Sequence, residues 1–147
     1  MKSIVSIAFF LVLAVFVAAA YWPANVSKNG IHFYQGTLAE AIKKSKQENK
    51  PVFVDVSASW CGYCKKLKRN GFSDKEVGSY FNDHFINVSI DGERGEGPSV
   101  AKQYNVQGYP TLFVLDKEGN VLLYSSGYMD KEQLLNFALV AVKKLTE

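Results

Sequence analysis

Apolar and polar positions follow two rhythms along most of this chain. Several short runs are apolar at nearly every position, and between them apolar residues recur every three or four positions. The first rhythm is typical of buried strands, and the second of helices that bury one face. Strands are therefore expected at 52–57, 85–90, 111–115 and 121–125, with 31–35 as a possible short first strand.

Helices are expected between these strands. One opens at Thr37, a second follows Cys61 and bends near Asn70-Gly71, and a third packs Val77, Tyr80 and Phe81. A brief helix covers 99–104, and the last begins at Asp130. The order β-α-β-α-β-α-β-β-α predicts an α/β fold class, with a central mixed β-sheet flanked by helices on both faces and a terminal antiparallel hairpin.

Three helix starts show the capping-box pattern, a small polar or acidic residue followed three positions later by Glu or Gln. The pairs are Thr37 with Glu40, Ser73 with Glu76, and Asp130 with Gln133. The last helix is expected to bury one apolar face, made of Leu134, Leu135, Phe137, Ala138, Ala141, Val142 and Leu145.

The N-terminus has a different pattern. Lys2 precedes an almost unbroken apolar run that ends near Trp22 and contains three consecutive alanines at 18–20. A charged start, an apolar stretch and small residues predict a signal peptide at 1–20. An uncleaved membrane anchor is the alternative, because a run of this length can just span a bilayer. Either alternative predicts an extracytoplasmic, periplasmic location, with a linker at 21–35 and one domain at 36–147.

Composition narrows the function classes. The chain has 147 residues, 48% of them hydrophobic, which is enough for one packed core. The net charge of +3 is spread along the chain, with acidic residues among the lysines. A nucleic-acid-binding protein would need basic residues clustered on one face, so no nucleic-acid partner is expected.

Cys61 and Cys64 are the only cysteines in the chain. A bridge between them would close a very short loop and would restrict the unfolded chain little, so a purely structural role is a poor explanation. They lie where a strand passes into a helix. A cysteine in the first helical turn is favoured as thiolate by the backbone N–H groups and the helix dipole. We therefore expect Cys61 to be the attacking sulfur and the more buried Cys64 to be the resolving one.

A metal site is the alternative use of two cysteines. Zinc sites need three or four protein ligands, and the chain has no second cysteine pair. His32 and His84 are the only histidines and lack ligand spacing to each other. No metal and no cofactor are expected, since the two sulfurs alone can carry the reducing equivalents.

The roles of several residues around the cysteine pair remain open from the sequence. Asp55 is either a buried acid that relays a proton to or from Cys64, or a solvated residue at a sheet edge. Trp60 is either part of the core or a shield and contact beside the thiolate, and Tyr63 is expected to be exposed. Base frequencies predict a trans bond before Pro110. The basic residues after Cys64 are expected to be a solvated helix face with a secondary electrostatic influence, namely Lys65, Lys66, Lys68 and Arg69.

Three motifs together resemble the thioredoxin superfamily: Val54-Asp55, Trp60-Cys61-Gly62-Tyr63-Cys64-Lys65 and Gly108-Tyr109-Pro110-Thr111. The stretches 72–77 and 127–130 are similar to exported thioredoxin-like proteins such as the C-terminal domain of the interchange protein DsbD. The Gly62-Tyr63 dipeptide departs from thioredoxin and matches the isomerase DsbC, whose dimerisation domain this chain lacks.

The resemblance implies a thioredoxin-like fold and assigns roles to individual residues. Cys61 and Cys64 would form the redox-active disulfide, with Asp55 as the buried acid beneath them. Pro110 would be cis, against the trans prediction above. Clients would dock on the residues around the pair, namely Trp60, Gly62, Tyr63, Tyr109 and Pro110. A lysine that thioredoxins place near the acid is replaced by Asn87, so Asp55 should be protonated more readily.

The leading hypothesis is an exported thiol–disulfide oxidoreductase that reduces or exchanges disulfides in extracytoplasmic proteins. Its partners would be disulfide-bearing or dithiol client proteins and a thiol electron donor, which a membrane-anchored form could meet at the membrane. The alternatives are a disulfide oxidase or isomerase, and a non-catalytic binding or chaperone module.

Overall fold

A four-stranded mixed sheet organises the molecule. The computed structural model describes residues 30–146, so the expected signal peptide and most of the linker lie outside the described residues. The elements in chain order are α2 (Leu38–Glu48), β1 (Val52–Ser57), α3 (Gly62–Leu67), η1 (Lys68–Phe72), α4 (Lys75–His84), β2 (Ile86–Asp91), α5 (Gly97–Gln103), β3 (Thr111–Leu115), β4 (Val121–Ser126) and α6 (Lys131–Lys144). Within this part of the chain, no helix has the length and apolar character needed to cross a membrane.

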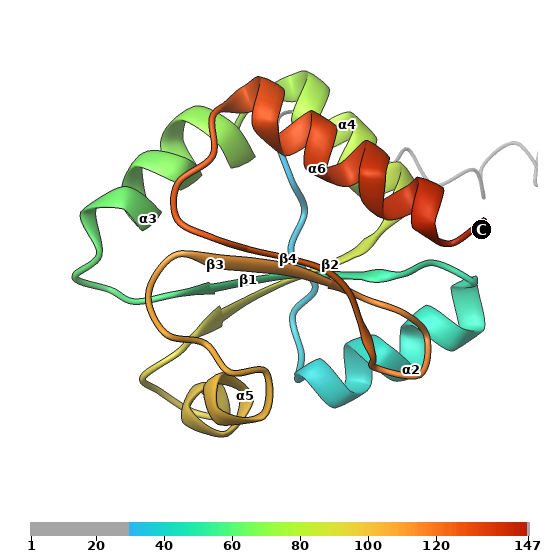
Figure 1. The fold of residues 1–147 in the computed structure, drawn as a ribbon, viewed down its shortest axis with the longest axis horizontal. Coiled ribbons are helices and arrows are strands. Elements are labelled where there is room, and N and C mark those ends of the chain that lie inside the picture. The colour runs from blue at the N-terminus through green and yellow to red at the C-terminus, as the bar shows by residue number, and fades with distance from the viewer. Residues whose placement is uncertain (1–29, 147) are drawn as a thin grey trace, which may run out of the picture.

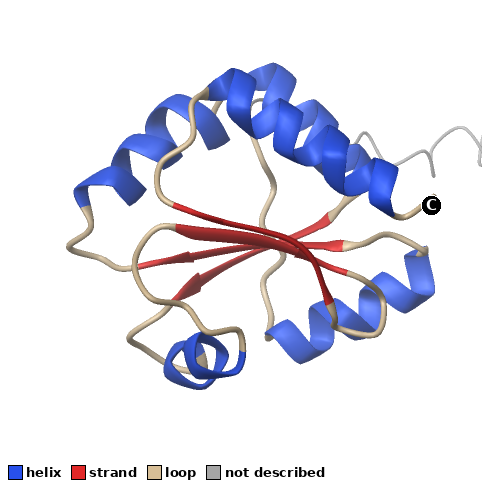
Figure 2. Cartoon of the chain, in the orientation of Figure 1, coloured by secondary structure: helices blue, strands red, loops and turns tan. Residues whose placement is uncertain are grey.

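The strands lie in the order β2-β1-β3-β4. β1 pairs with β2 in parallel and with β3 antiparallel, and β3 and β4 form the expected antiparallel hairpin. β1 is therefore a central strand, whereas β2 is an edge strand (Figure 2). A central strand of a covered sheet has both faces buried, and every residue of β1 is buried.

Helices cover both faces of the sheet, as Figure 1 shows. α3, α4 and α6 lie on one face, and α2 and α5 on the other. Because side chains alternate along a strand, β1 sends Phe53 toward the first face and Val52, Val54 and Val56 toward the second. The sheet therefore separates two hydrophobic clusters, and the expected α/β architecture is confirmed.

Residues 31–35 do not form the strand that their apolar pattern suggested. The segment makes one isolated parallel bridge, between Phe33 and Asn87, and the amide of Tyr34 donates to the carbonyl of Asn87 at 2.7 Å. The amide of Ile31, at the start of the segment, instead donates to the carbonyl of Phe72 in η1. The chain thus crosses the edge of β2 rather than running along it.

Two of the three expected capping boxes are present, at Thr37 and at Asp130. The third is wrong: α4 is capped by Asp74, whose side chain accepts from the amides of Glu76 and Val77. Ser73 lies at the end of the preceding helical segment, and its hydroxyl donates to the carbonyl of Arg69. The expected bend at Asn70-Gly71 is the π-helix η1, which displaces the start of α4 by one residue.

The apolar face of α6 is shorter than the sequence suggested. Leu134, Phe137, Ala138 and Ala141 are buried, as expected. Leu145 is exposed, because it lies at the C-cap of α6, beyond the part of the helix that packs on the sheet.

Candidate active site

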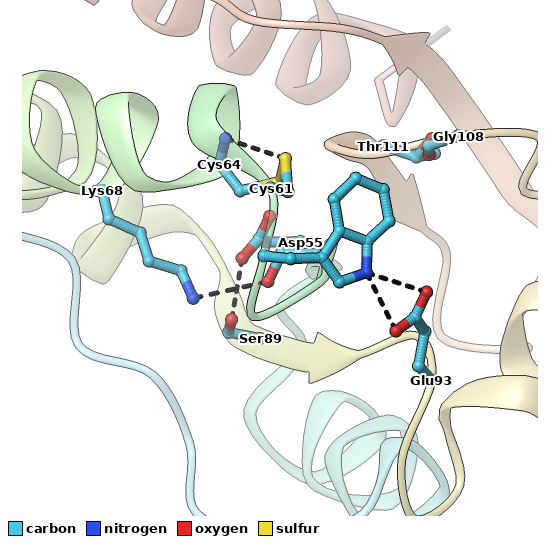
Figure 3. Close-up of a disulfide and its surroundings, with 10 residues drawn as sticks. Asp55, Cys61, Cys64, Lys68, Ser89, Glu93, Gly108 and Thr111 are labelled. Carbon is cyan, nitrogen blue, oxygen red and sulfur yellow. Dashed lines mark hydrogen bonds between the residues drawn. A yellow bond between two sulfur atoms is a disulfide. The ribbon is translucent and has the colours of Figure 1, made fainter.

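The two cysteines lie just past the carboxyl end of β1 and are joined by a disulfide (Figure 3). Cys61 is the N-cap of α3, with extended backbone angles, and its sulfur accepts the amide of Cys64 at 3.1 Å. An unpaired amide at a helix start stabilises negative charge, so this amide would also stabilise a Cys61 thiolate. Both cysteines are buried, Cys64 at 2% and Cys61 at 4% exposure, so their burial does not distinguish the attacking from the resolving sulfur.

Asp55 lies in the middle of β1 and is 1% exposed, so the alternative of a solvated residue at a sheet edge is wrong. Its Oδ2 accepts a hydrogen bond from the hydroxyl of Ser89 at 2.7 Å. Its Oδ1 is buried and has no hydrogen-bond partner among the described residues. Burial disfavours the charged carboxylate and raises the pKa of Asp55 to about 6, although the Ser89 hydrogen bond and the charge of Lys68 act in the opposite direction.

Ser89 and Lys68 were not predicted as site residues. Parallel pairing of β1 and β2 places Ser89 opposite Asp55, and Asn87 opposite Phe53. The amide group of Asn87 donates to the carbonyls of His32 and Phe81. The strict alternation in 86–91, where every second residue is polar, was the signal that these side chains share one face of β2.

Trp60 is not part of the core, because 66% of its surface is exposed. Its Nε1–H donates to both carboxylate oxygens of Glu93, at 3.1 and 3.0 Å. Its ring meets Tyr109 edge-on, with 6.1 Å between the ring centroids. The loop after β2 thus holds Trp60 beside the disulfide, and this contact could not be predicted from the sequence.

The remaining predicted docking residues surround the same spot. The Tyr109-Pro110 bond is cis, as the resemblance implied, and Tyr109 packs on the cluster of Ala58 and the two cysteines. Tyr63 is exposed, as expected, and its ring lies 6.3 Å from that of Tyr128. Gly62 begins α3 and is exposed. Aromatic rings therefore border the disulfide on two sides.

The described residues contain no group of three or more His, Cys, Asp or Glu side chains placed to hold a metal ion. His84 stacks on Tyr80, and its Nδ1 pairs with the carbonyl of the same residue. His32 lies in the segment that crosses the edge of β2.

Comparison with known proteins decides the family. The family described as thioredoxin-like domain matches residues 38–139, which include the strand, cysteine and proline motifs. The chain belongs to this thioredoxin-like family. Its relatives include the thiol:disulfide interchange protein DsbD of Yersinia pestis, 32% identical over 104 residues. That match covers 69% of this chain but only 16% of DsbD, so the chain spans about a sixth of the relative's length.

Solved structures support the same thioredoxin-like assignment. A protein from Bacteroides thetaiotaomicron, described as a candidate disulphide-isomerase, is 38% identical, with a TM-score of 0.70 over 80% of this chain and 98% of that one. The reduced C-terminal domain of DsbD from Neisseria meningitidis has a TM-score of 0.58 and 23% identity, over 69% of this chain and 91% of that one. The second likeness concerns the fold alone. Family and cysteine pair together support thiol–disulfide oxidoreductase activity.

Proposed function

We propose that this protein is an exported thiol–disulfide oxidoreductase that reduces or exchanges disulfides in extracytoplasmic proteins. The observation that carries the proposal is the position of Cys61, at the N-cap of α3 with the Cys64 amide on its sulfur. That position favours a nucleophilic thiolate, and Cys64 lies within bonding distance of it.

In the reducing direction, the Cys61 thiolate attacks one sulfur of a client disulfide and forms a mixed disulfide. The displaced client sulfur leaves as a thiolate and takes a proton from water. Cys64 then loses its proton, and its sulfur attacks Cys61. The bond between Cys61 and the client breaks, the client leaves fully reduced, and the protein holds the Cys61–Cys64 disulfide until a thiol donor reduces it.

Asp55 is the proposed acceptor of the Cys64 proton. The oxygen that Ser89 does not occupy is buried and unpartnered, and in Figure 3 it lies on the side of the disulfide. A carboxyl with a pKa near 6 exchanges protons readily at neutral pH, as a general base should.

Client proteins are proposed to dock on the rim around the disulfide, formed by the exposed residues Trp60, Gly62 and Tyr63, the half-buried Tyr109 and the buried Pro110. Large exposed rings supply apolar contact area without strict sequence demands. Export, and an electron donor at the membrane, follow from the apolar leader at 1–20 and remain part of the proposal. Mass measurement of the protein from a cell envelope fraction would show whether the leader is cleaved after residue 20.

Paired cysteine variants test the catalytic assignment. Cys61→Ser should abolish reduction of a model protein disulfide such as that of insulin. Cys64→Ser should retain attack but accumulate mixed disulfides with clients, which non-reducing gels and mass spectrometry would identify. Full activity of Cys61→Ser would refute the oxidoreductase assignment and leave a binding or chaperone module.

Disulfide isomerisation is the second candidate, favoured by the Bacteroides relative described as a candidate disulphide-isomerase and by the Gly62-Tyr63 dipeptide. Equilibration with glutathione would fix the redox potential and so the net direction. Recovery of scrambled ribonuclease would separate isomerisation from reduction, because only rearrangement restores its activity.

A further inference from the structure

Within residues 30–146, the carboxyl group of Asp55 has one hydrogen-bond partner, and that partner reaches solvent. On β3 its neighbour is Leu112, which is fully buried. On β2 its neighbour is Ser89, which is exposed because β2 is an edge strand. The hydroxyl of Ser89 donates to Oδ2 of Asp55 at 2.7 Å. A hydroxyl can accept a second hydrogen bond while it donates one, so Ser89 can contact water and Asp55 together.

A surface pocket borders this hydroxyl. The pocket has a volume of about 380 Å³ and is lined by Ser89, Lys68, Ser73, Ile31, Phe33 and Phe72. Three of its walls are apolar, so water that enters it finds its polar partners mainly at the other three residues. The pocket lies on the face of the sheet that η1 covers, and its lining includes none of the residues on which clients are proposed to dock.

Lys68 brings a positive charge to the same pocket. It follows Cys64 by one helical turn, and its Nζ donates to the hydroxyl of Ser57 at 3.4 Å. Ser57 lies two residues after Asp55 and shares its face of β1. The charge of Lys68 lowers the pKa of Asp55, although burial has the larger, opposite effect.

The other elements packed around Asp55 add no competing charge to it. β2 contributes Ser89 and β3 contributes Leu112, both uncharged. α3 contributes the two cysteines, which are held as a disulfide. Lys68 is thus the charged side chain that acts on this carboxyl from the helical layer.

Building on the proposed function, we propose that Ser89 and Lys68 form the proton outlet of Asp55. Ser89 passes the proton between the carboxyl and water in the pocket, and Lys68 is a positioning residue whose charge keeps the carboxylate able to accept it. Lys68 thus supplies, from the helix after the cysteines, a positive charge near the acid that the resemblance places at the position of Asn87 in thioredoxins.

The proton balance of this route is simple. When Cys64 attacks Cys61, its thiol proton passes to Asp55, which becomes neutral. Rotation of the carboxyl group then turns the protonated oxygen toward Ser89, and the hydroxyl of Ser89 turns from Asp55 toward the pocket. The carboxyl proton moves to Oγ of Ser89 while the hydroxyl proton of Ser89 moves to a water molecule. Asp55 is again a carboxylate, Ser89 is unchanged, and one proton has reached solvent. The reverse sequence protonates Cys64 when a donor reduces the disulfide.

Lys68 is tested by the pKa of Asp55, measured by carboxyl ¹³C NMR on the oxidised protein without any client. Lys68→Met should raise that pKa by about 0.5–1 unit, because an opposite charge is lost. Lys68→Arg should restore it. Lys65→Met removes the same charge three residues earlier and is the matched control, with no shift expected. Equal values for Lys68→Met and Lys65→Met would overturn the role of Lys68.

Ser89 is tested by the rate of the resolving step, followed from a preformed mixed disulfide between Cys61 and a small thiol. Ser89→Ala should slow this step about tenfold and change its solvent isotope effect, because the proton loses its path. Ser89→Thr keeps a hydroxyl and should restore the rate. Ser73→Ala, in the same pocket but without contact to Asp55, is the control. A Ser89→Ala rate equal to that of the control would overturn the outlet.

These outcomes are separable from failure of the proposed function. The NMR comparison needs no turnover, so it judges Lys68 even in a protein that reduces no client. If Cys61→Ser lost activity while Ser89→Ala kept the wild-type resolving rate and Lys68→Met kept the wild-type pKa of Asp55, the oxidoreductase proposal would stand. The proton outlet would then be rejected. Ser89 and Lys68 both have exposed side chains, so their substitution should leave the fold intact.

Discussion

Asp55 lies in an environment unlike that of an aspartate in water. It is buried in a central strand, and among the described residues Ser89 alone donates a hydrogen bond to its carboxylate. Its pKa of about 6 means that the folded protein holds this proton over a range where the unfolded chain, with a value near 3.8, has lost it. Stability contributed by the neutral form is therefore full below pH 3.8 and is lost as the pH rises through 6.

Asp55→Asn should remove this pH dependence, because the amide does not ionise. A shift of about two pKa units corresponds to about 3 kcal/mol at most. The unfolding free energy of the variant minus that of wild type should therefore be more positive at pH 7.5 than at pH 4, by up to about that amount, because wild type loses stability over this range and the variant does not. Urea unfolding of the oxidised proteins at the two pH values measures it, and an equal difference at both would contradict the burial argument.

The reacting residues could be found in the sequence, because Cys-x-x-Cys spacing and the strand-to-helix junction are local properties. The contacts that tune them could not. Ser89 and Glu93 reach Asp55 and Trp60 across 34 and 33 positions of the chain. Lys68 was expected to be a solvated residue with an influence on the thiolate, and only the packing of η1 against β1 shows that its charge acts on Asp55.

At the scale of elements, the start of α4 shows how a local pattern can mislead. Ser73 and Glu76 have capping-box spacing, but η1 continues to Phe72 and leaves Ser73 in its last turn. Asp74 then becomes the first residue whose side chain can reach the unpaired amides of α4. The sequence offers both candidates, and the π-helix before them decides between them.

Asp74→Ala should destabilise the protein by about 1–2 kcal/mol, the usual cost of an acidic cap. Ser73→Ala should cost less than half of this, since its hydroxyl donates to η1 and not to α4. Hydrogen bonding, chiefly from the Val77 amide, lowers the pKa of Asp74, so the contribution of the cap is present above pH 3.8 and is lost on acidification. Urea midpoints at pH 7 and pH 3 test both statements, and equal costs at pH 7 would restore Ser73 as the cap.

The contact of α4 with the entering chain gives a second test. A Cβ on Gly78 would lie 2.2 Å from the carbonyl carbon of Gly30. Alanine normally stabilises a helix interior relative to glycine by about 1 kcal/mol. Here Gly78→Ala should instead destabilise by about 1–3 kcal/mol, because the backbone must move apart. Ser79→Ala, exposed on the same helix, should change stability by less than about 0.5 kcal/mol. Thermal unfolding measures the stability of both variants. A Gly78→Ala variant more stable than wild type would show that the backbone at Gly30 can move without a free-energy penalty.

At the scale of the whole molecule, strand and helix order followed from the apolar pattern because each element buries a face of the same sheet. The segment 31–35 departed from its pattern because it finds its amide partners at the edge of β2 and at η1 rather than along one strand. Pairing partners for so short a segment are set by the completed sheet. The cis bond at Tyr109-Pro110 likewise had no local signal, and only the family resemblance predicted it.

The net direction of the redox reaction is also a property of the whole molecule, and it can be predicted from charge. Reduction at neutral pH would place a Cys61 thiolate above the buried carboxyl of Asp55, where two negative charges repel each other. The neutral disulfide avoids that repulsion, whereas the Cys64 amide at the start of α3 stabilises the thiolate. We expect the repulsion to be the larger effect because Asp55 is buried, so the oxidised protein should unfold at a higher urea concentration than the reduced one. If the folded protein is more stable with the disulfide than with the dithiol, its dithiol is a better reductant than that of the unfolded chain. The redox potential then falls by about 30 mV for each 1.4 kcal/mol of difference in unfolding free energy. Glutathione equilibration and the difference in unfolding free energy should then agree, and a reduced form more stable than the oxidised form would make the protein an oxidant.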